Sequence, residues 1–181
     1  VSLNIRCDFS TISFPLSVIT IFLGLSLPLI SATEKTLPSL HFINSAKSSR
    51  KLYVSGQHTI PSDTVCYPAK LIHGHIEDLL ARGVKNIFYP CMSYNIDENL
   101  GDNNYNCPVV AYYSELLRSN LDELKEVEYL YPYLNINSSK ELERGIYKSL
   151  SKIAKIDKKQ LKKAIKTAQI AYEKWKFDIR Y

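Results

Sequence analysis

Several sequence signals are missing from this chain of 181 residues, and each absence narrows the possible functions. No glycine-rich phosphate-binding loop occurs, so the chain shows no ATP site of its own. Four cysteines are too few for a disulfide scaffold, and none belongs to the C-x2-4-C pair that structural zinc sites usually contain. Residue 1 is Val rather than Met, which indicates a fragment, a processed chain or a misassigned start.

Basic charge is concentrated at one end of the chain. Residues 140–181 contain 13 Lys/Arg and five Asp/Glu, a net charge of +8, out of +5 for the whole sequence. The remaining residues, 1–139, therefore have a net charge of −3. A uniform basic surface of the kind that binds nucleic acid is not indicated. We expect a basic C-terminal helical region and no nucleic-acid partner.

The long apolar run at residues 12–30 permits three interpretations. It is uncharged and just long enough for a transmembrane helix. Arg6 before it and Ser31-Ala32-Thr33 after it are typical of a secretory signal, whereas Pro15 and Pro28 argue against a continuous helix. A pair of fully buried strands would also be continuously apolar. A membrane or signal segment, a buried core segment and a sequence artefact all stay open.

Three cysteines lie in similar local settings between Thr59 and Pro108. Cys66, Cys91 and Cys107 each have a proline and a tyrosine within two positions, and 24 and 15 residues separate them. Thiols on backbone stiffened by proline indicate a preformed ligand set, because thiolates select zinc or iron–sulfur clusters. The long separations favour a cluster, in which one iron would take a water, a substrate oxygen or a non-cysteine ligand. Packing in the core is the alternative for each thiol.

The pattern around Cys91 is that of an α/β protein. Apolar residues recur at three- and four-residue steps from Ala69, and Gly83 is expected to end that helix. Residues 84–89 then read as a buried strand, which places Cys91 at its carboxyl end, where ligands collect in doubly wound sheets. A polar surface loop, 93–106, is expected to deliver Cys107 to a helix over 108–121, with Pro108 in its first turn.

The remaining pattern completes an α/β fold with flavodoxin- or Rossmann-like layers, a short parallel sheet and a helical C-terminal part. We predict further strands over 40–44 and 127–133, and helices over 46–54, 138–154 and 158–178, the last capped by Asp157 with Gln160. Three regions result: an atypical apolar segment at 1–45, a cysteine-bearing α/β domain at 46–135, and basic C-terminal helices at 136–181.

Other polar residues near Cys66 have structural explanations. Ser62 or Asp63 is expected to cap the segment after the Ile60-Pro61 turn. His73 and His75 are two residues apart on the expected helix, so they point to different sides and do not easily share a metal ion. Lys70 places a positive charge four residues after Cys66, either beside an anionic cluster or in solvent.

The phrases TIPSDTVCYPAKLIHGHIEDLL, FYPCMSY and NYNCPVV carry a family resemblance. They resemble the activase-related proteins of the 2-hydroxyacyl-CoA dehydratase family, which includes the (R)-2-hydroxyglutaryl-CoA dehydratase and benzoyl-CoA reductase subunits. The resemblance is strong from Ser48 to Leu121 and extends through the C-terminal helices. It does not cover residues 1–45 or Cys7, which is not assigned, and family chains are usually longer, which indicates a fragment.

The resemblance implies a function in low-potential electron transfer. It implies that Cys66, Cys91 and Cys107 hold a [4Fe–4S] or larger iron–sulfur cluster, which receives electrons from an ATP-hydrolysing activator domain or subunit. Further dehydratase-like domains and an acyl-CoA substrate are implied as partners. The implied location is the cytoplasm, although residues 12–30 leave membrane association open.

Two other functions compete with this interpretation. In the first, the chain is a non-catalytic interaction module, stabilised by a cluster or zinc, that docks a partner subunit through its basic helices. In the second, it is a membrane-anchored domain whose cysteines are reduced or disulfide-bonded. The sequence does not name the substrate or the fourth ligand, and we do not expect this chain alone to complete catalysis.

Overall fold

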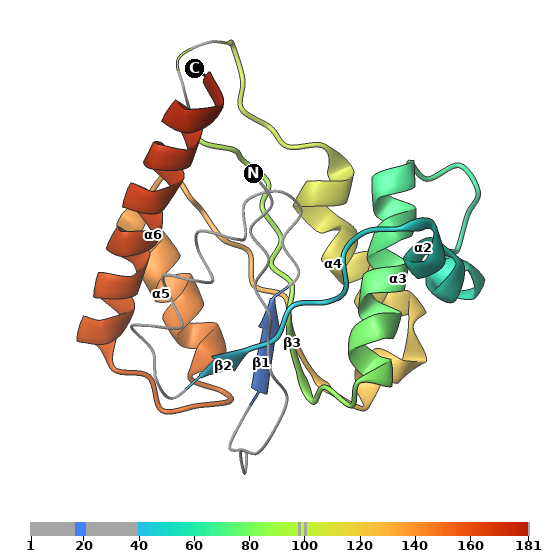
Figure 1. Cartoon of the computed structure of the whole chain (residues 1–181). Coiled ribbons are helices and arrows are strands. Elements are labelled where there is room, and N and C mark those ends of the chain that lie inside the picture. Colours follow the sequence, from blue (N-terminus) through green and yellow to red (C-terminus); the bar gives the residue numbers. More distant parts are fainter. Residues whose placement is uncertain (1–16, 21–39, 98, 100, 181) are drawn as a thin grey trace.

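A short parallel sheet forms the centre of the fold. The computed structural model describes residues 17–20, 40–97, 99 and 101–180. Its four strands have the order β2-β1-β3-β4, and all neighbouring pairs are parallel (Figure 1). Their bounds are β1 Ser17–Thr20, β2 His41–Phe42, β3 Asn86–Phe88 and β4 Glu128–Leu130. This order, 2-1-3-4, is the one found in flavodoxin-like doubly wound sheets, and the predicted α/β class is confirmed.

The part of the apolar run that the structure describes is a central strand. β1 pairs with β2 through Ser17↔His41 and with β3 through Ile19↔Ile87. Of the interpretations of residues 12–30, a strand of the sheet is the one that residues 17–20 adopt. Residues 12–16 and 21–30 lie outside the described residues. Within the described ranges, no helix has both the length and the apolar character needed to cross a membrane.

Helices connect and cover the strands. Most predicted helices are confirmed within a few residues, while the strands are shorter than predicted. The helices are α2 Arg50–Gly56, η1 Gln57–Thr59, α3 Tyr67–Ala81, α4 Pro108–Asn120, η2 Asp122–Lys125, α5 Ser139–Leu150 and α6 Lys158–Arg180.

The helix termini depend on local sequence. The Asp157 carboxylate accepts the Lys159 N–H at 2.8 Å and so caps α6, as predicted. After α3, Gly83 has a positive φ of 72°, which confirms its predicted role as the residue that ends the helix. The predicted capping of the segment after Ile60-Pro61 is confirmed for Ser62, whose hydroxyl accepts the Thr64 N–H at 3.2 Å inside the loop. The N-cap position of α3 itself belongs to Cys66.

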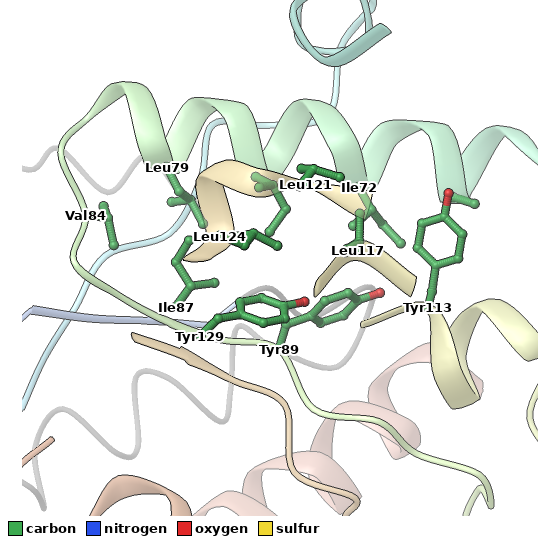
Figure 2. Packing of buried hydrophobic residues seen from close by; sticks show 12 residues of the cluster. Ile72, Leu79, Val84, Ile87, Tyr89, Tyr113, Leu117, Leu121, Leu124 and Tyr129 are labelled. Carbon is green, nitrogen blue, oxygen red and sulfur yellow. The ribbon is translucent and has the colours of Figure 1, made fainter. Parts of the chain in front are cut away.

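One face of the sheet packs against α3 and α4. Ile87 and Tyr129, on β3 and β4, point into this layer and meet Ile72 and Leu79 of α3 and Leu117 of α4 (Figure 2). Alternation along a strand sends the neighbouring residues to the opposite face, so Phe88 and Leu130 belong to a second cluster. That cluster is completed by residues of α5 and α6, among them Leu150, Leu161, Ala164 and Ile165.

The close approach of α2 to α3 depends on two glycines. A Cβ atom on Gly74 would lie 2.0 Å from the Leu52 carbonyl oxygen, and one on Gly56 would lie 2.2 Å from the Gly74 nitrogen. Neither position can accept a larger side chain unless the backbone moves. The contact therefore fixes α2 and the adjoining η1 turn against α3, directly before the loop that leads to Cys66.

Candidate cysteine site at the carboxyl edge of the sheet

The fold brings the three predicted site cysteines to one edge of the sheet. Cys91 lies three residues after β3, and Cys66 and Cys107 are the N-cap residues of α3 and α4. Because α3 leads into β3 and α4 leads into β4, both helices run opposite to the strands, and their N-termini lie at the carboxyl edge (Figure 1). The strand order reverses between β1 and β3, which is the switch point where such folds bind ligands.

Cys66 and Cys107 have nearly identical settings. Both are exposed, carry free thiols and adopt extended backbone angles, with φ and ψ of −64° and 157° at Cys66 and −61° and 156° at Cys107. A proline occupies the first turn of each helix, where a missing N–H costs nothing. The positive end of a helix dipole therefore lies beside each thiol, an arrangement that favours a negatively charged ligand.

Cys91 is buried, in contrast to the other two cysteines. Its backbone continues the sheet: the N–H donates to the Pro132 carbonyl and its carbonyl accepts from the Leu134 N–H, both at 2.9 Å. Burial raises the pKa of the Cys91 thiol, and the charge of Glu115 raises it further. Burial is the larger of these two effects.

Two buried phenols, Tyr89 and Tyr113, are affected by the charges of the cysteines. Burial raises the pKa of Tyr89, and the charges of Cys91, Tyr113 and Cys107 raise it further. Burial likewise raises the pKa of Tyr113, with a contribution from the charge of Cys66. The charges of two cysteines thus act on the pKa of Tyr89, and the charge of the third acts on the pKa of Tyr113.

The loop before Cys107 is held in a defined shape. Tyr94 and Tyr105 form an antiparallel bridge, their hydroxyls are 2.9 Å apart, and their ring centroids are separated by 4.5 Å. The Asn106 side-chain amide donates to the Met92 carbonyl at 3.0 Å, which ties the end of the loop to its start. The predicted surface loop thus delivers Cys107 close to the end of β3, near Cys91.

Ser114, a polar residue buried in the layer between α4 and the sheet, was not predicted from the sequence. Its hydroxyl donates to the Tyr89 carbonyl at 2.5 Å and lies 2.8 Å from the Tyr129 hydroxyl. The signal that could have found it is its spacing, since Ala111, Ser114 and Leu117 recur at three-residue steps on the buried face of α4. A hydroxyl on an apolar stripe needs a partner, here the backbone of β3.

His73 and His75 point to different partners, as predicted. His73 is fully buried and lies between the Thr59 and Tyr113 hydroxyls, at 2.8 and 2.9 Å. His75 lies between the Ser45 and Ser48 hydroxyls, at 2.7 and 3.0 Å. Burial lowers the pKa of both imidazoles, that of His73 to about 4. Both histidines therefore anchor neighbouring segments to α3.

The three thiols at this sheet edge are free, and thiolates are ligands for zinc and for iron–sulfur clusters. Across the described ranges, no group of three or more His, Cys, Asp or Glu side chains is close enough to hold one metal ion.

The layered sheet and the thiols at its carboxyl edge define a flavodoxin-like α/β protein with a cysteine-lined site. The family model described as "CoA enzyme activase uncharacterised domain" matches residues 35–181. The chain belongs to this CoA enzyme activase-related family. Comparison with curated proteins and with solved structures found no match.

Proposed function

We propose that this chain is an iron–sulfur module of the CoA enzyme activase-related family, in which Cys66, Cys91 and Cys107 hold a [4Fe–4S] or larger cluster. The observation that carries the proposal is the convergence of three distant cysteines on the carboxyl edge of one sheet, at its switch point. A structural core thiol would not need to be exposed, yet Cys66 and Cys107 are.

The residues around the thiols favour an anionic cluster on this chain. The N-termini of α3 and α4 place partial positive charge beside Cys66 and Cys107. Near Cys91, the Tyr133 hydroxyl donates to the Glu115 carboxylate at 2.7 Å, which partly offsets that negative charge. The Glu115 carboxylate acts in the opposite direction to the two helix N-termini.

The proposed role is in low-potential electron transfer. When bound, the cluster would supply one electron at a time to an acyl-CoA-like substrate, after reduction by an ATP-hydrolysing activator domain or subunit. Further dehydratase-like domains are the proposed partners that bind the substrate, as in the 2-hydroxyacyl-CoA dehydratases. We propose the cytoplasm as the location, because the free thiols suit a reducing compartment.

Anaerobic reconstitution of the full chain with iron and sulfide tests this function. We expect a brown, oxygen-sensitive protein with broad absorbance near ~400 nm, the region in which thiolate-bound iron–sulfur clusters absorb. The triple variant Cys66→Ala, Cys91→Ala, Cys107→Ala should lose the absorbance, the EPR signal and the bound iron. Cys7→Ser is the matched control, and it should keep all three.

Two results would overturn the proposal. One is a colourless protein that binds a single zinc ion tightly. The other is a triple variant that binds as much iron and sulfide as the native chain, since the cluster would then have ligands elsewhere.

A second candidate function is a docking module, and the surface of α6 favours it. The helix buries Leu161, Ala164 and Ile165, while its lysines form the exposed face. Ile170 and Phe177 are also exposed, by 62% and 64%, so apolar and basic side chains share this helix. Such a surface would bind an acidic partner subunit, with a cluster or zinc stabilising the module.

A further inference from the structure

Three polar side chains joined by hydrogen bonds, two of them buried, link the two helices that begin at the exposed cysteines. His73 on α3 contacts Thr59 of η1 through Nδ1 at 2.8 Å and Tyr113 of α4 through Nε2 at 2.9 Å. The Tyr113 ring meets the imidazole edge-on, with centroids 5.7 Å apart. His73 is 0% and Tyr113 5% exposed, so water does not compete for the contact between them, whereas Thr59 is half-buried.

The direction of each hydrogen bond is set by the first donor. The Thr59 hydroxyl donates to the Gly56 carbonyl at 2.9 Å, so its oxygen accepts the Nδ1–H of His73. Nε2 of the neutral imidazole then carries no hydrogen and accepts the Tyr113 O–H. Each of the three side chains therefore has its hydrogen bonds satisfied, and the loss of one side chain would leave a buried polar atom unpaired.

The three hydrogen-bonded side chains lie on or beside both helices, close to their cysteines. His73 is seven residues after Cys66, which is about two helical turns, and Tyr113 is six residues after Cys107. Thr59, at the other end, is seven residues before Cys66. One imidazole thus joins the segment that enters the Cys66 loop, the helix that leaves it and the helix that leaves Cys107.

We propose that His73 and Tyr113 are positioning residues that fix the separation of the Cys66 and Cys107 thiols. The directional hydrogen bond between His73 of α3 and Tyr113 of α4 holds the two helix N-termini, and therefore the two N-cap thiols, at one distance. Apolar packing alone would let the helices slide, because it is not directional. The inference deepens the proposed function, on which the need for a fixed thiol separation rests.

Cross-linking of the two thiols in the cluster-free full chain tests this inference. In a Cys7→Ser, Cys91→Ala background, Cys66 and Cys107 react with bis-maleimides of graded spacer length, and mass spectrometry measures the yield. We expect one preferred spacer. Tyr113→Phe keeps the ring but removes the hydroxyl. The cross-linking yields of the other spacers should then rise about five-fold relative to the yield of the preferred spacer. This is the population change expected on losing one hydrogen bond.

Tyr129→Phe is the matched control, because it removes a buried hydroxyl that contacts Ser114 rather than α3. It should leave the preferred spacer unchanged. Thr59→Val removes the hydrogen bond between Thr59 and His73 and should broaden the spacer profile in the same direction. This variant keeps the test decisive if Tyr113→Phe does not fold.

If Tyr113→Phe folds and keeps the native spacer profile, the inference is overturned. If Tyr113→Phe does not fold, a native profile in Thr59→Val overturns it. Equal broadening in Tyr129→Phe also overturns it. Reconstitution is a separate measurement. A chain that holds no cluster but shows the expected spacer profiles would overturn only the proposed function, and unchanged profiles in a cluster-binding chain would overturn only the positioning role.

Discussion

Burial fixes the protonation state of His73, and this has a consequence for stability. Desolvation lowers the pKa of His73 from 6.5 to about 4 in the folded protein, while the unfolded chain keeps the ordinary value. Between these two values the unfolded state binds more protons. The free energy of unfolding should therefore fall as the pH is lowered from 6.5 toward 4, by at most about 1.4 kcal/mol per pH unit from this group. Above pH 6.5 His73 contributes no pH dependence.

Urea unfolding between pH 4.5 and 7.5 measures this effect, with His73→Asn and His58→Asn as a pair of variants. His58 is exposed and its side chain makes no hydrogen bond with Thr59, His73 or Tyr113 in the part of the chain that the structure describes, so His58→Asn is the control for the loss of a histidine elsewhere on the chain. His73→Asn should have a shallower slope, although His75, whose pKa burial also lowers, contributes to all three proteins. Three parallel slopes would contradict the assignment of His73 as a buried neutral imidazole.

At the residue scale, the local sequence pattern predicted where helices and strands lie along the chain, but not which buried polar side chains contact one another. The sequence placed Cys91 after a strand and Cys107 before a helix because turn residues and apolar periodicity mark such boundaries. It did not reveal that Tyr113 meets His73, since those residues are 40 positions apart and no local rule pairs them. The spatial relation of the three thiols needed the sheet order as well.

At the scale of elements, the glycine contact between α2 and α3 predicts a large effect of a small change. Gly74→Ala places a Cβ atom 2.0 Å from the Leu52 carbonyl oxygen, so α2 must move away. We expect a loss of about 1–3 kcal/mol in the free energy of unfolding, the usual cost of overpacking, as measured in urea. Gly101→Ala is the control: its Cβ would meet nothing nearer than 3.9 Å. Equal stabilities of the two variants would contradict the packing described.

The exposed lysines of α6 predict a dependence on ionic strength if this helix docks a partner. Lys162→Glu, Lys163→Glu and Lys166→Glu together should slow association with a purified ATP-hydrolysing activator about ten-fold at low salt, because charge steers encounter. The difference should disappear at high salt. Surface plasmon resonance at two salt concentrations measures both effects.

The control for this prediction reverses three exposed lysines elsewhere on the chain, Lys47, Lys51 and Lys85. The control protein should associate at the native rate, and cluster content should be unchanged in both variants. Equal slowing by the two sets would indicate a net-charge effect rather than docking through α6.

For the whole molecule, the sheet combines segments that the sequence could not assign to one unit. Helices over 108–120 and 158–180 were predicted well because their apolar stripes are long. β1 was not, because an uncharged run suits a membrane helix, a signal and a buried strand equally well. Pairing with β2 and β3, a property of distant residues, decides between them.

The position of β1 leads to a prediction for the intact protein. The family match begins at residue 35, whereas β1 lies before it and pairs along both of its edges. Deletion of residues 1–34 should leave the edge of β3 without its ladder partner and β2 detached, and unpaired strand edges promote aggregation. The truncated chain should unfold at a lower urea concentration than the full chain, and its free energy of unfolding should depend less steeply on urea concentration. Circular dichroism measures both quantities.

Deletion of residues 1–10, which retains β1, is the control and should have little effect. Identical unfolding curves for the 35–181 chain and the full chain would show that the β3 edge is stable alone. The central place of β1 in the sheet would then be refuted.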